Sequence, residues 1–226
     1  MKGLRATLTA ALLAIAFSLL LGTLLGITRL MLGRTARMPV VGFIELLRGL
    51  PVVISIYLAS RMLPELGLDL SFMPGGRNLW YLVIGLTAYN SVILAEILRS
   101  GVNALPKGQK EAAAAIGLTE FQTMRMILLP QAVRIMLPAL ISQLVVILKD
   151  TSLSAVLGLY PELLKSAQRV YQSLDNPIQA LFVVGLMFIC INYALSRLAT
   201  YVESRMARGR RALGADVEQP AEATAG

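Results

Sequence analysis

Three neighbouring polar side chains at the end of an apolar stretch offer the most complete set of ligand-binding groups in this sequence. Lys149, Asp150 and Thr151 supply a cation for a carboxylate, an anion for an ammonium group and a hydroxyl group for either one. A free amino acid presents both a carboxylate and an ammonium group. An ion pair within the chain, or an anchor at a membrane interface, explains Lys149 and Asp150 equally well.

A second charged pair lies in an earlier apolar stretch. Glu45 and Arg48 are three residues apart, so they can pair on one face of a helix. Gly49 and Pro51 would break that helix, and the freed backbone groups could line a cavity. A kinked helix that carries its own ion pair explains the pattern without a ligand, and we prefer this interpretation.

Two further polar groups lie in and after a third apolar stretch. Asn90, between Tyr89 and Ser91, could line a polar path, but hydrogen bonding to another helix accounts for it equally well. Glu96 and Arg99 are again three residues apart. We expect them to pair with one another or with the basic loop that follows.

Several kinds of chemistry have no residues to support them. The sequence contains no His, and Cys190 is its single Cys, so zinc sites and disulfides within one chain and His-based catalysis are excluded. No G-x-x-x-x-G-K-[ST] pattern occurs, so any phosphate-binding loop for ATP must belong to a partner. We therefore expect no catalytic residue, no metal site and no cofactor bound by this chain.

The composition predicts an all-α, polytopic membrane protein. Of 226 residues, 56% are hydrophobic and 15% charged, with a mean hydropathy of +0.69, whereas soluble domains carry about 25% charged residues. A membrane span needs about 20 apolar residues. Three stretches meet or approach this length, and two shorter or interrupted ones complete a prediction of about five spans. The five are residues 6–28, 38–60, 78–95, 135–148 and 176–196.

The distribution of Lys and Arg predicts the orientation, because cytoplasmic loops retain positive charge during insertion. With five spans and the N-terminus outside, most basic residues fall on the cytoplasmic side, together with the C-terminus. Lys2 and Arg5 before the first span oppose this assignment. The net charge of +8 comes from residues that flank spans, so we expect anionic lipid headgroups, not nucleic acid, as the partner of these charges.

The chain is expected to form one membrane domain over residues 1–208, with a basic cytoplasmic loop at 100–120. Residues 209–226 are rich in Ala, Glu, Gly and Pro without apolar periodicity, which predicts a disordered cytoplasmic tail. We expect residues 62–77 to form an external loop. The first apolar stretch is too long for a cleaved signal peptide, and its Gly22 and Gly26 form a G-x-x-x-G packing motif.

The basic loop opens a pattern of seven defined positions, E-A-A-x3-G-x9-I-x-L-P. Its residues are Glu111, Ala112, Ala113, Gly117, Ile127, Leu129 and Pro130. Glu111 near a helix start complements the helix dipole, four successive alanines favour a slim helix, and Gly117 can close that helix in a left-handed conformation. Such a helix is suited to docking, although an ordinary interfacial helix with an Ala-rich face is the alternative.

This pattern resembles the EAA loop of permease subunits of bacterial ABC importers. Other segments resemble permeases for polar amino acids of the histidine, glutamine and glutamate type, and they follow in that family's order over nearly the whole chain up to the tail. These are Arg48–Pro51, with Leu50 where Thr is frequent, and residues 95–101, 106–109, 129–132 and 148–152. The sequence from Gln131 to Thr151 is most similar to permeases grouped with glutamate or glutamine uptake.

The resemblance implies a type I importer permease fold and a non-catalytic subunit of a bacterial inner-membrane transporter. It implies two ABC ATPase subunits that bind ATP and magnesium, a second permease chain, the same or related, and an extracytoplasmic solute-binding protein that delivers the amino acid. The seven EAA positions would couple to the ATPases. Lys149, Asp150 and Thr151, with Glu45, Arg48 and Asn90, would lie along a substrate path that opens by alternating access.

Two other functions remain open at this point. An ion-coupled secondary amino-acid transporter would work without an ATPase, but no internal repeat is visible, which argues weakly against an inverted-repeat transporter. A passive membrane anchor would be unaffected by substitutions at Lys149 or Asp150. The complete EAA pattern favours the importer permease over both.

Overall fold

The structure is a computed structural model that describes residues 2–215, with side chains in that range except 199, 202–203 and 205–215. Within the described range the chain is helical and has no strand, as the composition predicts. Its elements are α1 (Lys2–Met31), α2 (Arg34–Gly49), α3 (Val52–Glu65), α4 (Arg77–Asn103), α5 (Gly108–Ala115), α6 (Glu120–Gln122), the π-helix η1 (Thr123–Leu128), α7 (Leu129–Asp150), α8 (Leu153–Val156), α9 (Leu163–Leu174) and α10 (Pro177–Ala215).

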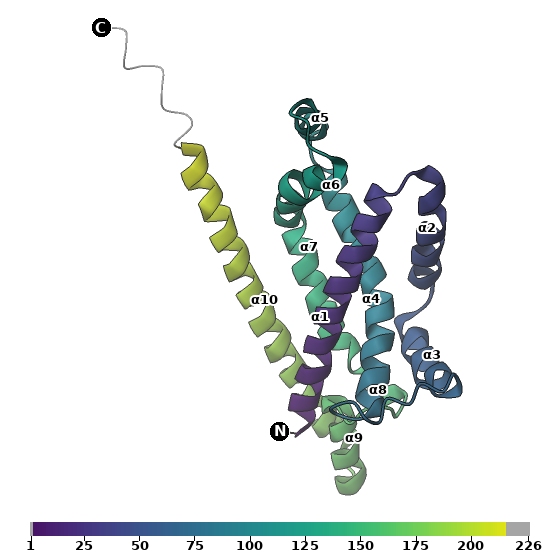
Figure 1. Ribbon diagram of the computed structural model, residues 1–226. Coiled ribbons are helices and arrows are strands. Elements are labelled where there is room, and N and C mark those ends of the chain that lie inside the picture. Colours follow the sequence, from purple (N-terminus) through teal and green to yellow (C-terminus); the bar gives the residue numbers. More distant parts are fainter. Residues whose placement is uncertain (1, 216–226) are drawn as a thin grey trace.

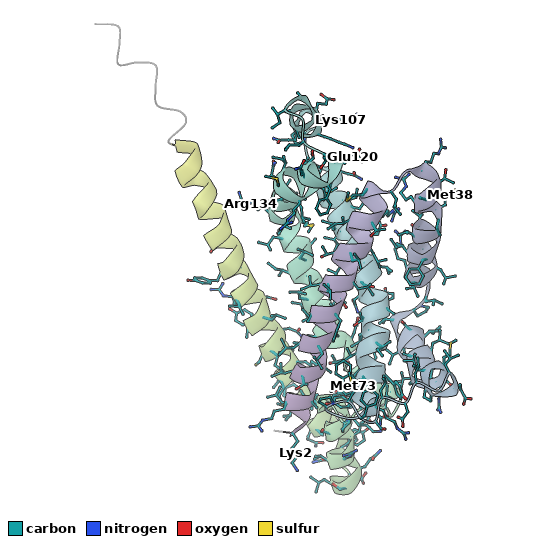
Figure 2. All side chains as sticks on the ribbon, viewed as in Figure 1. Lys2, Met38, Met73, Lys107, Glu120 and Arg134 are labelled. Carbon is teal, nitrogen blue, oxygen red and sulfur yellow. The ribbon has the colours of Figure 1, made fainter. Side chains whose placement is uncertain are left out.

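The helices form a bundle with two distinct ends. Helix α5 projects from one end, and α9 lies at the opposite end together with the N-terminus (Figure 1). We call these the α5 end and the α9 end. Met73, in the loop between α3 and α4, lies at the α9 end, whereas Lys107 and Glu120 lie at the α5 end (Figure 2).

Four described helical segments are long and apolar enough to cross a membrane, and a bent pair of helices makes a fifth candidate. The bent pair is α2 with α3, whose axes differ by 104°. Gly49 ends α2 and Pro51 precedes α3, so the break that the sequence predicts at these residues is confirmed, and residues 38–60 are not one straight helix. The prediction of about five spans agrees with this count.

Helix α1 packs against α4 through small side chains. Its buried residues are Gly3, Thr7, Ala10, Ala11, Ala14, Ser18, Gly22 and Gly26, which recur mostly every three or four positions and therefore share one face. Gly3 and Thr7, at the start of this face, meet α9 instead of α4. A Cβ atom added at Gly22 would lie 2.7 Å from both the Leu94 Cβ and the Ser91 carbonyl oxygen. The predicted packing role of the G-x-x-x-G motif is confirmed, because the backbones approach too closely there for any side chain.

Helix α3 approaches α4 just as closely. A Cβ atom added at Gly85 would lie 2.5 Å from the Ile56 Cα, and the Ser55 hydroxyl donates a hydrogen bond to the Gly85 carbonyl (2.9 Å). Ile56 also packs into the largest buried apolar cluster, with Leu82 and Leu86 of α4 and Ile147 of α7. This cluster fixes the short helix α3 across the bundle after the sharp bend.

Helix α10 stands apart from the rest of the bundle over much of its length (Figure 1). Only 6% of its most apolar window is buried, against 67% for α4. The helix runs through Ala215, so the domain boundary expected at residue 209 does not coincide with a helix end. Residues 216–226, the remainder of the expected disordered tail, lie outside the described residues.

Candidate coupling segment and charged sites

Helix α5 ends in a hydrogen-bonded glycine cap. Gly117 has φ +79°, and its N–H donates to the Ala114 carbonyl (3.0 Å), while the Leu118 N–H donates to the Ala113 carbonyl (3.1 Å). This pair of bonds is the Schellman motif, which needs the left-handed conformation that glycine adopts without strain. The predicted role of Gly117 in closing the helix is confirmed, as is the position of Glu111 in the first turn.

The surface of the α5 segment is exposed and partly apolar. Ala113 is buried, but Glu111 and Ala112 are exposed. Ile116 is 76% exposed and Phe121 is 54% exposed. Large apolar side chains that project from a polar segment often mark a protein contact. The sequence pattern missed these two residues, because they occupy undefined positions of the motif.

Two polar contacts attach α5 to the helix that continues into the membrane. The Gln131 amide of α7 donates to the Gln109 side chain of α5 (3.3 Å) and to the Ile127 carbonyl (2.9 Å). Lys110 forms an ion pair with Glu120 at 3.4 Å. Because both partners of that ion pair are about two-thirds exposed, it contributes little stability, and the Gln109–Gln131 contact is the better defined of the two.

The last part of the EAA pattern lies in a local change of helix type. Thr119 caps α6 in a reciprocal capping box with Gln122, and the chain then passes through the π-helix η1 into α7. Ile127 lies in η1, and Leu129 and Pro130 begin α7. Pro130 has no N–H to donate to the helix. The wider π-helical turn before it lets the chain continue as a helix although this hydrogen bond is not made.

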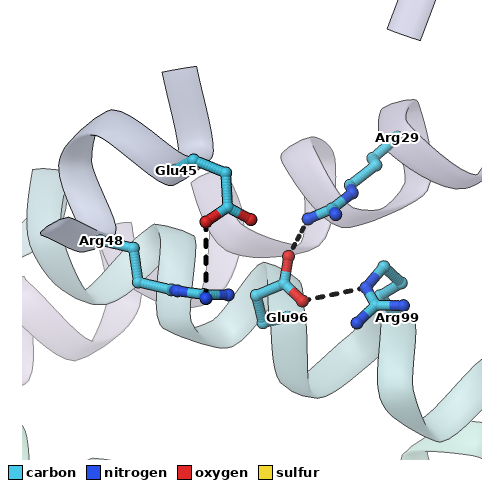
Figure 3. Close-up of polar contacts among 5 residues, drawn as sticks. All are labelled: Arg29, Glu45, Arg48, Glu96 and Arg99. Atoms are coloured by element: carbon cyan, nitrogen blue, oxygen red, sulfur yellow. Dashed lines mark hydrogen bonds and ion pairs between the residues drawn. The ribbon is translucent and has the colours of Figure 1, made fainter. Parts of the chain in front are cut away.

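A cluster of three charges lies near the α5 end, between α1 and α4. Glu96 accepts hydrogen bonds from Arg29 of α1 and from Arg99, one turn further along α4, at 2.9 Å for Arg99 (Figure 3). The pair of Glu96 with Arg99 confirms the prediction. The contact with Arg29 was missed, because nothing local in the sequence links residues so far apart. The side chains of Arg29 and Glu96 are only 14% and 15% exposed.

Glu45 and Arg48 pair on α2, as predicted, at 3.4 Å (Figure 3). Their side chains are 47% and 49% exposed, so they lie on the outside of this chain. Figure 3 shows the pair beside the Glu96 cluster, with no bond joining the two groups. Glu45 and Arg48 thus neutralise one another within the chain, and both side chains stay accessible to another molecule.

Lys149, Asp150 and Thr151 end α7 toward the α9 end. Lys149 is exposed, Asp150 is half-buried, and Thr151 is buried, with its hydroxyl donating to the Leu148 carbonyl (2.7 Å). Among the described residues no ion pair joins Lys149 to Asp150, and no bond joins this group to Glu45 or Arg48. The structure therefore does not bring the predicted path residues into one site within a single chain.

Asn90 is fully buried between α4 and α7. Its amide donates to the Leu86 carbonyl (2.8 Å), and its Oδ1 accepts a hydrogen bond from Gln143 of α7 (2.6 Å). Hydrogen bonding between helices, one of the two interpretations open from the sequence, is present. A place for Asn90 along the substrate path stays a prediction.

Glu162 is a buried cap at the α9 end that the sequence did not reveal. Its carboxylate accepts hydrogen bonds from the Leu164 and Lys165 N–H groups at 2.7 Å each, which caps α9. The Thr7 hydroxyl of α1 also interacts with this carboxylate and accepts from the Leu163 N–H (3.0 Å). Burial raises the pKa of Glu162 above its ordinary value, against the opposite effect of these hydrogen bonds.

The chain matches known proteins over most of its length. Residues 18–208 match the family model described as binding-protein-dependent transport system inner membrane component. The glutamate transport system permease protein GluD of Corynebacterium glutamicum is 41% identical over 211 residues, which cover 93% of this chain and 76% of that protein. The probable glutamine ABC transporter permease protein GlnP of Bacillus subtilis is 36% identical, with 90% of this chain and 91% of that protein covered.

Solved structures agree with these relatives. A crystal structure of an amino acid ABC transporter with histidines matches with a TM-score of 0.79 and 26% sequence identity. The match covers 90% of this chain and 92% of that one. The similarity therefore extends over the helical bundle as a whole and is not confined to the EAA pattern.

Proposed function

Because the chain belongs to the family of binding-protein-dependent transport system inner membrane components, we propose that it forms the translocation path of an ATP-driven importer for polar amino acids, with glutamate or glutamine as the substrate. The two similar proteins named for glutamate and glutamine transport support this substrate class. The single observation that carries the proposal is the exposed, glycine-capped helix α5 within a complete EAA pattern.

Helix α5 is the proposed docking site for an ATPase subunit. Its exposed residues Glu111 and Ala112 leave a slim surface, and Ile116 and Phe121 extend that surface with apolar side chains that can fill a pocket on a partner. Two permease chains, the same or related, would present two such helices to two ATPase subunits. ATP with its magnesium ion would be hydrolysed there, and this permease chain would contribute no catalytic residue.

Movement of α5 would reach the membrane through α7. The Gln109–Gln131 contact connects the coupling helix to the start of α7, and Lys149, Asp150 and Thr151 lie at the other end of the same helix. A rigid helix transmits a displacement at one end to the other, so closure of the ATPases would shift the proposed substrate contacts. Alternating access then follows from different ATP and substrate affinities of the two states.

The proposed substrate path lies between two permease chains. Lys149 is exposed and forms no ion pair among the described residues, so its ammonium group can reach a substrate carboxylate, and the half-buried Asp150 can receive an ammonium group. Glu45 and Arg48 are accessible on the outside of α2 and would contribute from the same or the second chain. Asn90 would support the path by holding α7 on α4.

The proposed orientation places the α5 end and the C-terminus in the cytoplasm and the α9 end outside, in a bacterial inner membrane. A solute-binding protein would deliver the amino acid at the α9 end. The basic residues concentrated at the α5 end support this orientation, because positive charge is retained on the cytoplasmic side.

Uptake by proteoliposomes that contain this chain with its co-purified partners tests the proposal. We expect uptake of radiolabelled glutamate or glutamine to require ATP and to fall at least tenfold in Gly117→Val, because a β-branched residue is strained at φ +79°. Gly117→Asn is the matched control, since Asn tolerates the left-handed conformation. Uptake without any ATPase, or uptake that follows an ion gradient, would instead identify a secondary transporter.

The path residues have a separate test. Lys149→Met and Asp150→Asn should raise the KM for uptake while ATP hydrolysis by the complex continues, because they remove charges proposed to contact substrate. Lys165→Met removes a cation of α9 that is not proposed to contact substrate and serves as the control. Unchanged KM in both α7 variants would remove Lys149 and Asp150 from the path and leave them as a structural feature of the helix end.

A further inference from the structure

A cavity of about 720 Å³ lies at the α5 end of the bundle. Five cationic side chains line it: Arg29 of α1, Arg37 of α2, Arg99 of α4, and Lys107 and Lys110 at the start of α5. In the described part of the chain, no acidic residue lines this cavity. Several separate elements thus direct positive charge into one space.

The carboxylates nearby balance only part of this charge. Glu96 is shared by Arg29 and Arg99, and Lys110 pairs with Glu120 at the surface. Glu45, which pairs with Arg48, also attracts Arg29. The side chains of Arg37 and Lys107 form no hydrogen bond or ion pair with any described residue. The nearby carboxylates do not balance all five cations, so an anion that entered the cavity would reduce the repulsion that remains among them.

The rest of the cavity wall is mostly apolar. Leu30 lies one residue after Arg29 near the end of α1, Val41 lies one turn after Arg37 on α2, and Val102 lies near the end of α4. Met124 and Leu128 of η1 close the side toward α7. Cations and apolar side chains therefore share one cavity beside the ends of α1 and α4, as at the boundary between the headgroups and the acyl chains of a membrane.

We propose that this cavity binds an anionic phospholipid of the inner leaflet, with the headgroup phosphate between Arg37 and Lys107 and the first part of the acyl chains against the apolar wall. The leaflet assignment rests on the orientation of the proposed function. Retention of positive charge explains why these residues share one side of the membrane, but it does not require them to converge on one cavity. The lipid would connect α2 to the start of α5, which no side-chain bond among the described residues does.

Lipid binding to the purified full complex tests the site. Native mass spectrometry would count the phosphatidylglycerol molecules bound per permease chain, with phosphatidylcholine as the zwitterionic comparison. The double variant R37Q/K107Q should weaken phosphatidylglycerol binding at least fivefold and leave phosphatidylcholine binding unchanged. The charge-conserving variant R37K/K107R should retain most of the binding and shows that the exchanged positions tolerate substitution.

The matched control is R61Q/R77Q, which removes the same charge at the α9 end. Equal loss in this control, or no loss in R37Q/K107Q, would overturn the site. Displacement of the lipid by glycerol phosphate or glutamate at similar concentrations would show that the cavity takes a soluble anion, which also overturns the proposal. Binding is measured without ATP or transport, so a negative result leaves the proposed importer function intact, and a chain that failed to import would still be able to bind the lipid.

Discussion

Helices α1 and α10 are both long and apolar enough to cross a membrane, but they differ in the size and burial of their side chains. Helix α1 turns a face of small side chains toward its neighbours, and its backbone approaches α4 so closely that Gly22 has no space for a Cβ atom. Helix α10 presents large exposed side chains such as Phe182, Ile189 and Tyr193, and only 6% of its apolar window is buried. The difference shows that α1 is held by close contacts within this chain, whereas the outer face of α10 is available to lipid or to another chain.

The largest expected effect compares a glycine from each surface. Gly22→Leu should destabilise the protein by about 3 kcal/mol or more, because the new side chain overlaps Leu94 and the Ser91 carbonyl. Gly185→Leu in α10 should change stability by less than about 0.5 kcal/mol, because a Cβ atom there meets nothing within 4 Å. Thermal unfolding of both variants in one detergent measures the difference. Equal destabilisation would mean that α10 packs as tightly as α1.

A second comparison concerns charge at the buried α1–α4 contact and on the exposed face of α2. Glu96→Gln should cost about 2 kcal/mol, because Arg29 and Arg99 lose a shared carboxylate that is largely shielded from solvent. Glu45→Gln should cost at most about 1 kcal/mol, because both members of its pair are half exposed. Unfolding in increasing denaturant ranks the two. A larger loss for Glu45→Gln would place α2 in a more enclosed environment than the single chain shows.

The same contrast explains how much the sequence could predict. The spans, the break at Gly49 and Pro51 and the cap at Gly117 follow from local rules on apolar length and backbone conformation, and the structure confirms them. The Arg29–Glu96 contact depends on how α1 and α4 are aligned, which no local pattern specifies.

The candidate site shows the same limit. Gln109 and Gln131 both belong to segments that the family resemblance singled out, but their contact needs α5 to fold back on α7. Lys149 and Glu45 are not joined within the described chain, and a path between two chains cannot be assembled from one sequence. Exposure of Ile116 likewise follows from the loop geometry and not from its residue type.

A smaller effect compares two polar groups on membrane helices. Gln143→Leu should cost about 1 kcal/mol, because the buried Asn90 Oδ1 loses its donor. Asn192→Leu in α10 should be neutral or slightly stabilising, because its buried Oδ1 has no partner among the described residues. Differential scanning calorimetry of the two variants, with wild type as reference, measures the change in melting temperature. Destabilisation by Asn192→Leu would indicate that another molecule in the preparation satisfies that oxygen.

The smallest expected effect is a pH dependence where α1 meets α9 through Thr7 and the buried Glu162. Burial raises the pKa of this carboxyl, so the folded state binds its proton more tightly than the unfolded state, whose pKa is near 4.5. The stability from this group is therefore complete below pH 4.5 and decreases as the pH rises through the folded pKa.

Glu162→Gln retains an oxygen that can cap α9 but cannot titrate, so its melting temperature should fall less than that of wild type as the pH increases from about 4 to about 8. The difference between the two melting curves isolates Glu162 from every other titrating group. A wild type that gains stability over the variant with rising pH would show that the hydrogen bonds from Leu164, Lys165 and Thr7 outweigh burial. In that case the α1–α9 contact would be held by an ionised cap, and this end of α1 would depend on charge as the Glu96 end does.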